Sequence, residues 1–140
     1  MSSKEFFRSL TDEEWAERLD AESFDVLRNS GTERPWSSAL NQENRAGTYV
    51  CRGCVQPLYA SESKFNSGCG WPSFDQAIDS EAVTEHLDQS HGMVRVEMRC
   101  SQCGGHLGHV FPDGPTQTGM RHCVNGVALQ FRADNEAKEQ

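Results

Sequence analysis

The sequence contains no hydrophobic run that approaches the ~20 residues a transmembrane helix needs. Its first residues also lack the uninterrupted apolar segment of a signal peptide. We therefore expect a protein with no membrane partner, located in the cytoplasm, where thiols stay reduced. Repeats, low-complexity segments and linkers are absent as well, so the sequence predicts one domain that spans residues 1–140.

Positively charged residues are scarce. The chain has 13 Lys and Arg residues against 21 Asp and Glu residues, which gives a formal net charge of −8. Affinity for nucleic acid depends on Lys and Arg side chains that neutralise phosphates. The composition therefore argues against a nucleic-acid partner, and so against a zinc ribbon that binds DNA or RNA. It also argues against electrostatic binding to a membrane surface.

The N-terminal segment, from about residue 10 to residue 30, is predicted to form two short helices. Thr11 and Glu14 match a capping box. Asp20 is a suitable N-cap for the second helix, and Gly31 suits the left-handed position that ends a helix. These helices carry no reactive group, so we expect them to cover the core.

A β core is predicted over about residues 45–132. Residues 93–100 alternate apolar and charged side chains in their middle and form the clearest half-buried strand in the sequence. Residues 79–88 indicate a short helix, whereas the glycine-rich residues 104–120 predict turns and loops. The polar tail, residues 133–140, is expected to fray.

Residues 121–131 are predicted to form a single β-strand, because β-branched and aromatic residues recur there with a period near two. Alternation places the cation of Arg121, the thiol of Cys123 and the carboxamide of Asn125 on one face, beside an apolar run. Such neighbours lie roughly 6–7 Å apart, which is close enough to serve one small ligand. The alternative is that Cys123 is a buried small hydrophobic residue, as free cysteines usually are.

Four of the six cysteines form two Cys-x-x-Cys pairs. Each pair lets two thiolates from one tight turn reach the same ion, and two such turns complete a tetrahedral zinc site. Because 45 residues separate the pairs, this site would join two distant hairpins rather than build one local finger. Four thiolates leave no open position, so the zinc is expected to be structural. The predicted ligands are Cys51, Cys54, Cys100 and Cys103.

The same two pairs are also compatible with two roles that involve no metal. A Cys-x-x-Cys motif can be a redox pair of the thioredoxin kind, but that motif belongs near a βαβ pattern, which the sequence lacks. The pairs can also be disulfides of a secreted protein, but nothing in the sequence directs secretion. We favour one structural zinc ion over both.

The remaining cysteines, Cys69 and Cys123, are candidates for redox chemistry. Cys69 lies between Gly68 and Gly70 in a predicted flexible loop, beside Trp71 and Phe74, which can wall a small apolar pocket. A mobile thiol near a thiol on a strand is the layout of a resolving and an attacking cysteine. The competing hypothesis is a zinc-stapled β domain that binds a protein partner and in which Cys123 is only packed.

His106 and His109 add two imidazoles between the second Cys-x-x-Cys pair and the strand of Cys123. They can be ligands of a second metal or structural hydrogen-bonding groups. No carboxylate stands near them at ligand spacing, so we favour a role in supplying a proton or in orienting a polar ligand.

Several motifs together resemble the type B methionine sulfoxide reductases, and the likeness covers about residues 10–132. The motifs occur in the family's order alongside both Cys-x-x-Cys pairs. They are Gly31-Thr32-Glu33, Ser67-Gly68-Cys69-Gly70-Trp71-Pro72-Ser73-Phe74, Ser90-His91-Gly92-Met93, His106-Leu107-Gly108-His109-Val110-Phe111 and Arg121-His122-Cys123-Val124-Asn125. The sequence departs from the family at His122, where Tyr or Phe is common, and at Gly126-Val127-Ala128, where Ser-Ala-Ser is commoner.

The resemblance implies a mainly β fold, with two small antiparallel sheets stapled by the four-cysteine zinc site and short N-terminal helices. It implies reduction of methionine-R-sulfoxide in proteins, with Cys123 as nucleophile and Cys69 as resolving cysteine. The sulfenic acid on Cys123 would become a Cys123–Cys69 disulfide, which thioredoxin would reduce. The expected protein is a monomer with one zinc ion. The other expected site residues are His106, His109, Asn125 and Arg121 in catalysis, and Trp71, Phe111 and Asp113 in substrate binding.

Overall fold

The computed structural model describes residues 2–134 and begins with three short helices. Thr11 and Glu14 form the predicted capping box, in which each side chain accepts a hydrogen bond from the other's backbone N–H. Asp20 caps the next helix by accepting from the N–H of Ser23. A further helix, capped by Ser2, precedes the segment in which helices were predicted. The helices are α1 (Ser3–Arg8), α2 (Asp12–Arg18) and α3 (Ala21–Asn29).

The prediction for the end of α3 was wrong by one residue. Ser30, not Gly31, takes the left-handed conformation, with φ 59° and ψ 32°. The N–H of Gly31 donates to the carbonyl of Asp25 at 3.0 Å, and a Cβ at position 31 would collide with the Asp25 carboxylate. Glycine is therefore required here by a close approach rather than by its backbone angles.

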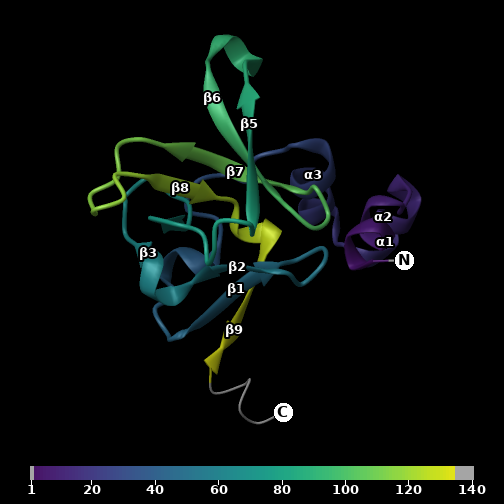
Figure 1. Cartoon of the computed structure of the whole chain (residues 1–140), viewed down its shortest axis with the longest axis horizontal. Helices are drawn as coiled ribbons and strands as arrows, with labels where there is room; N and C mark the ends of the chain where they lie inside the picture. The colour runs from purple at the N-terminus through teal and green to yellow at the C-terminus, as the bar shows by residue number, and fades with distance from the viewer. Residues whose placement is uncertain (1, 135–140) are drawn as a thin grey trace.

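The strands form two antiparallel sheets, which confirms the expected mainly β class (Figure 1). The three-stranded sheet has the order β2-β1-β9, with β1 (Gly47–Cys51), β2 (Pro57–Ala60) and β9 (Leu129–Ala133). The six-stranded sheet has the order β3-β4-β8-β7-β6-β5, with β3 (Lys64–Phe65), β4 (Ser73–Phe74), β5 (Val83–Asp88), β6 (Arg95–Cys100), β7 (His106–Phe111) and β8 (Arg121–Val124). Short 3-10 helices connect them: η1 (Ala39–Gln42), η2 (Ser61–Ser63), η3 (Ser90–Gly92) and η4 (Gly126–Ala128).

Two segment predictions within the larger sheet were wrong. Residues 79–88 contain β5 rather than a helix. Backbone pairing with β6 along the whole of β5 stabilises the extended conformation, which the local sequence pattern does not indicate. The glycine-rich residues 104–120 contain β7, which lies between β6 and β8. Gly108 sits inside β7 because a Cβ there would run into the backbone carbonyl of Cys123. The glycine marks a tight strand contact, not a turn.

The predicted continuous strand over 121–131 is also divided. β8 ends at Val124, the turn η4 follows, and β9 then joins the other sheet. The predicted alternation holds as far as Val124: His122 and Val124 are buried, whereas Arg121 and Cys123 are half-buried on the opposite side. The chain therefore changes sheets immediately after the residues predicted to be functional.

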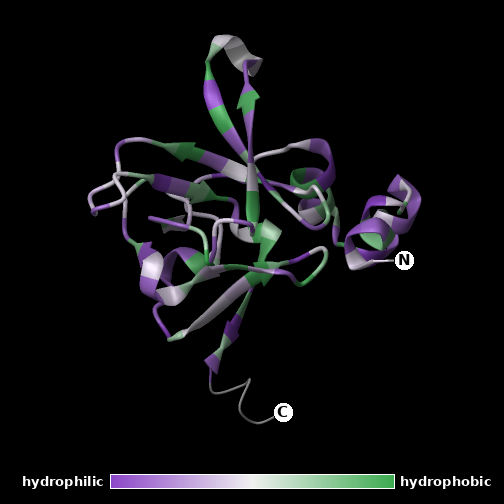
Figure 2. Ribbon diagram, viewed as in Figure 1, coloured by the Kyte–Doolittle hydropathy of each residue, from purple (hydrophilic) through white to green (hydrophobic). Residues whose placement is uncertain are grey.

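The core lies where the two sheets and the helices meet, and Tyr49, Tyr59 and Phe74 are fully buried in it. The rings of Tyr59 and Phe74 stack with their centroids 4.4 Å apart. Trp15 and Leu27 bring α2 and α3 into the same core, as expected for helices that cover it. Figure 2 shows mainly hydrophilic residues along α2, a mixture along α3, and hydrophobic residues at the centre of the smaller sheet.

Two expectations concern the ends of the chain and the membrane. The predicted polar tail, 133–140, begins inside β9, since Ala133 is buried; residues 135–140 lie outside the described residues. Within residues 2–134, no helix has the length and apolarity required to cross a membrane.

Candidate active site and metal site

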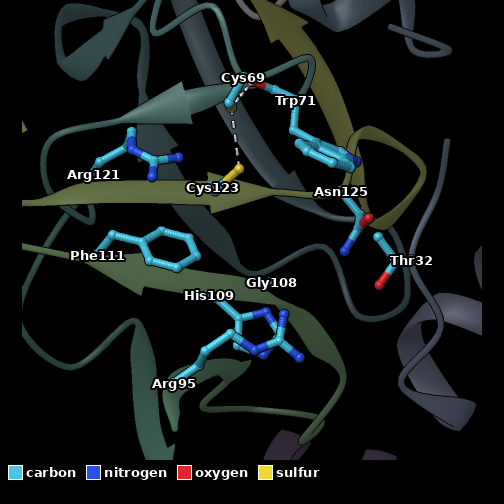
Figure 3. A pocket seen from close by; sticks show the side chains of 10 residues that line it. All are labelled: Thr32, Cys69, Trp71, Arg95, Gly108, His109, Phe111, Arg121, Cys123 and Asn125. Atoms are coloured by element: carbon cyan, nitrogen blue, oxygen red, sulfur yellow. Dashed lines mark hydrogen bonds between the residues drawn. The ribbon is translucent and has the colours of Figure 1, made fainter. Parts of the chain in front are cut away.

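A pocket of about 310 Å³ opens over β7 and β8 (Figure 3). Strand register places its centre: Cys123 pairs with His109 on one side and with Ser73 on the other, so these three side chains share a face. The loop before β4 adds the thiol of Cys69 and the indole of Trp71. The lining residues are Thr32, Cys69, Trp71, Arg95, Gly108, His109, Phe111, Arg121, Cys123 and Asn125.

The two cysteines outside the Cys-x-x-Cys pairs meet in this pocket. Their sulfur atoms, Cys69 Sγ and Cys123 Sγ, are 3.3 Å apart (Figure 3). Ser67 Oγ donates to Cys69 Sγ at 3.0 Å. Gly68 has a φ of +76°, and nothing lies within 4 Å of the place where its Cβ would be. The loop thus brings Cys69 to Cys123 while leaving open space on its N-terminal side.

The two thiols differ in acidity. Burial opposes ionisation of Cys69, but hydrogen bonds from Ser67 and Ser73 outweigh it and lower its pKa to about 7. Burial and the neighbouring Cys69 raise the pKa of Cys123 to about 12, against the opposing effect of Arg121. Arg121 acts in the expected direction, yet it does not prevail while Cys69 is in contact. While the two thiols are in contact, Cys69 is therefore the more acidic of the two.

Trp71 and Asn125 lie next to each other at one end of the pocket (Figure 3). Asn125 is 4% exposed, and its Nδ2 donates to the carbonyl of Leu107 at 2.9 Å. Its Oδ1 accepts from the backbone N–H of Glu33 at 2.9 Å. Trp71 Nε1 donates to the carbonyl of the same residue, Glu33, at 3.0 Å. Both side chains are held in fixed orientations.

His109 is held by a carboxylate that sequence reasoning missed. Its Nε2 lies 2.7 Å from Asp88 Oδ2. Hydrogen bonds from Ser90 and then from His109 hold the pKa of Asp88 below its usual range, so the carboxylate accepts and the imidazole donates. Arg95, also missed, donates to the same oxygen at 3.4 Å. Asp88 was missed because the end of β5 was expected to be helical. Arg95 lies in the segment predicted to be a strand, but nothing in the sequence indicated that it reaches Asp88.

His106 does not line the pocket. It is buried, and its Nδ1 lies 2.6 Å from Glu97 Oε2. Burial lowers the pKa of His106, although Glu97 opposes the shift. Its ring makes an edge contact with His109, with centroids 5.5 Å apart. Its Nε2 has no hydrogen-bond partner among the described residues. His106 therefore supports the wall behind His109.

Arg121, Phe111 and Asp113 form one cluster at the other end of the pocket. The guanidinium of Arg121 lies over the Phe111 ring, 4.4 Å from its centroid. Asp113 accepts two hydrogen bonds from Arg121, at 2.9 and 3.2 Å. Asp113 is largely exposed and does not line the cavity, so it touches the pocket only through Arg121.

His122 points away from the pocket. It is buried on the opposite side of β8, where its Nδ1 lies 3.1 Å from the hydroxyl of Tyr59. Burial lowers the pKa of His122. This departure from the family pattern therefore contacts the core rather than the space beside Cys123.

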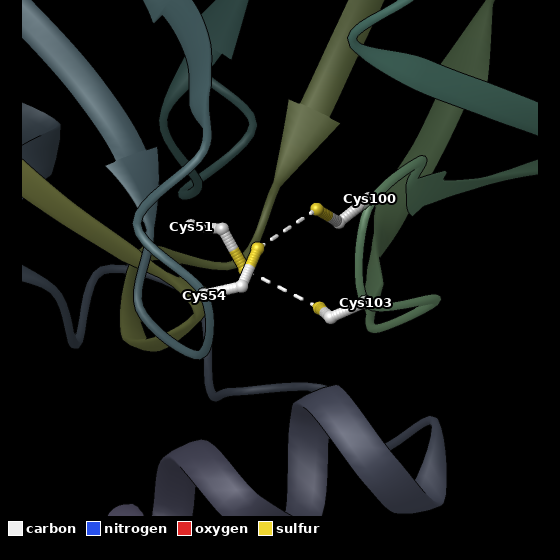
Figure 4. A group of neighbouring side chains, drawn as sticks. All are labelled: Cys51, Cys54, Cys100 and Cys103. Atoms are coloured by element: carbon white, nitrogen blue, oxygen red, sulfur yellow. Dashed lines mark hydrogen bonds between the residues drawn. The ribbon is translucent and has the colours of Figure 1, made fainter. Parts of the chain in front are cut away.

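The four cysteines of the two Cys-x-x-Cys pairs come together in a second place (Figure 4). Their sulfur atoms all lie within 4.8 Å of one another and are buried, so they can hold a metal ion. Two come from the turn after β1 and two from the turn after β6, and the cluster thus joins the two sheets. The N–H of Gly105 donates to Cys103 Sγ, and Gln56 Nε2 donates to Cys100 Sγ. Such donors favour thiolate ligands.

Comparison with known proteins agrees with this arrangement. Residues 19–133 match the family described as the SelR domain. The chain is 55% identical over 120 residues to the peptide methionine sulfoxide reductase MsrB of Pseudomonas putida (strain W619), covering 86% of this chain and 90% of that protein. It is 50% identical over 121 residues to the protein of the same name from Agrobacterium fabrum, with 86% and 90% covered. The corresponding protein of Hahella chejuensis is 50% identical over 131 residues, with 93% and 94% covered.

Proposed function

This chain belongs to the type B methionine sulfoxide reductases, and we propose that it reduces methionine-R-sulfoxide in oxidised proteins through the Cys123–Cys69 thiol pair. The observation that carries the proposal is the 3.3 Å contact between these two sulfur atoms at the wall of a pocket. A protein-binding module would need no second thiol at that position, and a merely packed Cys123 would not line a cavity.

In the first step, the Cys123 thiolate attacks the sulfoxide sulfur. One proton is taken up, the oxygen passes to Cys123 as a sulfenic acid, and the substrate leaves as the thioether. The methionine sulfur gains the two electrons that the Cys123 sulfur loses. His109, fixed by Asp88, is the proposed source of the proton on the oxygen. Trp71 offers the methyl group an apolar wall.

Formation of the thiolate depends on the position of Cys69. Part of the raised pKa of Cys123 comes from its contact with Cys69. Movement of Cys69 away from Cys123 would remove that contribution. Arg121 is then the charge that acts on Cys123, and it favours the ionised form.

In the second step, the Cys69 thiol condenses with the sulfenic acid, which forms a Cys123–Cys69 disulfide and releases water. An external dithiol then reduces this disulfide by thiol exchange and becomes a disulfide itself. Thioredoxin is the proposed reductant. One chain already supplies both thiols, the proposed proton donor and the apolar wall, so the reaction needs no second subunit, and we propose a monomer as the working unit.

The four-cysteine cluster is proposed to hold one structural zinc ion. All four donors are thiolate sulfurs, which suit zinc and leave no coordination position for substrate. Zinc would supply charge neutralisation and a link between the sheets, and it would take no part in the sulfoxide chemistry. A thiolate metal site and a recycled thiol pair both need a reducing compartment, so the cytoplasm is the proposed location.

The function is tested by offering the purified protein R- and S-methionine sulfoxide, each free and within a peptide, with dithiothreitol as reductant. We expect reduction of the R epimer, because only one epimer can place its methyl group on Trp71 and its oxygen toward the donors at the same time. The S epimer should react at a rate near that of the reductant alone. Equal rates with both epimers, or no turnover with either, would refute the proposal.

Replacing Cys69 by serine separates the two steps. We expect Cys69→Ser to release about one methionine per chain in a single turnover, since Cys123 is intact, and to lose recycling by thioredoxin. Quenched-flow product analysis gives the first quantity, and steady-state NADPH consumption in a thioredoxin-coupled assay gives the second. Ser67→Ala is the matched control, since it removes a hydrogen bond to Cys69 but no sulfur. Normal thioredoxin recycling in Cys69→Ser would show that Cys69 is not the resolving thiol.

A further inference from the structure

Glu33, in the segment between α3 and η1, is a buried acidic residue that has no role in the reaction proposed above. It is 8% exposed, and it ends the Gly31-Thr32-Glu33 motif. Its backbone N–H donates to Asn125 Oδ1, and its backbone carbonyl accepts from Trp71 Nε1. The backbone of one residue thus holds both side chains at this end of the pocket.

The Glu33 side chain ties this segment to the turn that follows Cys123. Its Oε1 accepts from the backbone N–H of Val127 at 2.9 Å, and Val127 lies in η4. Burial raises the pKa of Glu33, while the backbone N–H groups of Val127 and Gly126 oppose the shift. Oε2 has no hydrogen-bond partner among the described residues. A single oxygen therefore carries the anchoring contact.

We propose that Glu33 is a positioning residue that sets the spacing between Trp71 and Asn125 and thereby the selectivity for one sulfoxide epimer. The inference rests on the proposed function. An enzyme distinguishes two epimers at sulfur only if the methyl wall and the polar groups are held at a fixed separation. Trp71 supplies the wall, and Asn125 supplies a carboxamide at the polar side.

The carboxylate is what keeps this arrangement rigid. Without it, the N–H of Val127 loses its acceptor, and the segment of Glu33 loses its link to η4. The backbone of residue 33 would still bond to Trp71 and to Asn125, but its second tie to the turn after Cys123, through Val127, would be lost, and the segment could shift about the bonds that remain. The thiols and His109 make no contact with Glu33, so the chemistry of sulfur attack should be affected least.

The test compares Glu33→Ala and Glu33→Gln in single-turnover reduction of R- and S-sulfoxide peptides. For Glu33→Ala, we expect the half-saturating concentration of the R peptide to rise about tenfold and the R-over-S rate ratio to fall about tenfold, with a smaller loss of the maximal rate. Glu33→Gln keeps an oxygen for the Val127 N–H, so both quantities should return to within about twofold of the unmodified protein.

Controls separate positioning from stability. Glu17→Ala removes an exposed carboxylate of α2 that lies outside the active-site pocket, and it should change neither quantity. Glu33→Asp shortens the side chain by one methylene and should behave like Glu33→Ala, which keeps the test available if the alanine variant does not fold. A purely structural role would lower the melting temperature and the active fraction but leave the selectivity ratio unchanged.

Two outcomes overturn the inference. One is an unchanged selectivity ratio in both Glu33→Ala and Glu33→Asp. The other is a Glu33→Gln variant as impaired as Glu33→Ala, since the contact would then not depend on the accepting oxygen. Failure of the unmodified protein to reduce the R epimer would instead overturn the proposed function, so the two failures are distinguishable.

Discussion

Cys123→Ser is expected to reduce the rate of R-sulfoxide reduction by at least about a thousandfold. A serine hydroxyl is far less acidic than a thiol, and it cannot accept the sulfoxide oxygen as a sulfenic acid. The position is half-buried and the two side chains are nearly equal in volume, so the fold should be retained. Methionine release in a single turnover, measured by chromatography, checks the result.

The control for this variant is Cys69→Ser, which removes the other sulfur of the same contact. Both variants should have the melting temperature and the zinc content of the unmodified protein, so that a loss of activity is assigned to chemistry. Only Cys69→Ser should still release methionine. Appreciable methionine release by Cys123→Ser would mean that another thiol is the nucleophile.

Removal of the proposed zinc is expected to unfold most of the protein. Structural zinc contributes about 10–16 kcal/mol in zinc-finger peptides. That is as large as the ~5–15 kcal/mol by which a whole domain is stable. The contribution should be large here because the four cysteines connect one sheet to the other. Metal analysis should find one zinc ion per chain, and chelation under mild denaturant should collapse the near-ultraviolet circular dichroism signal.

Cys54→Ser provides the matched test, since it removes one proposed ligand far from the thiol pair. We expect it to lower the zinc content and the melting temperature, and to lose activity as the pocket strands lose order. Cys123→Ser is the control, because it also lacks one cysteine but keeps all four proposed ligands. It should lose its fold only when the chelator is added. A zinc-free protein that stays folded and active would refute the stapling role.

Sequence reasoning succeeded where local chemistry determines local structure. The capping box of Thr11 and Glu14 and the cap at Asp20 are present. A strand also precedes Cys100, but it begins at Arg95, and its burial does not follow the predicted alternation, since Glu97 is buried. Each of these features depends on residues within one or two turns or along one strand. The family, with its mainly β fold, was also identified from motifs that are short and contiguous.

The failures arose where distant strands decide the conformation. Gly108 reads as a turn residue, yet it lies inside β7 because Cys123 on the next strand approaches too closely for a side chain. Asp88 lies in a segment with a helical pattern, and only its pairing with Arg95 brings it to His109. Nothing near Glu33 in the sequence indicates that its backbone meets Trp71.

The burial of the four proposed metal ligands affects how the protein itself responds to the oxidants that produce methionine sulfoxide. Peroxide and hypochlorite, which oxidise methionine, also attack accessible thiolates. The four proposed ligands are at most 4% exposed, whereas Cys69 and Cys123 are open to the pocket. Small oxidants should therefore reach the proposed catalytic pair first, whose disulfide a dithiol would reduce, and should reach the proposed metal ligands last. With these roles, reversible inactivation would precede permanent damage.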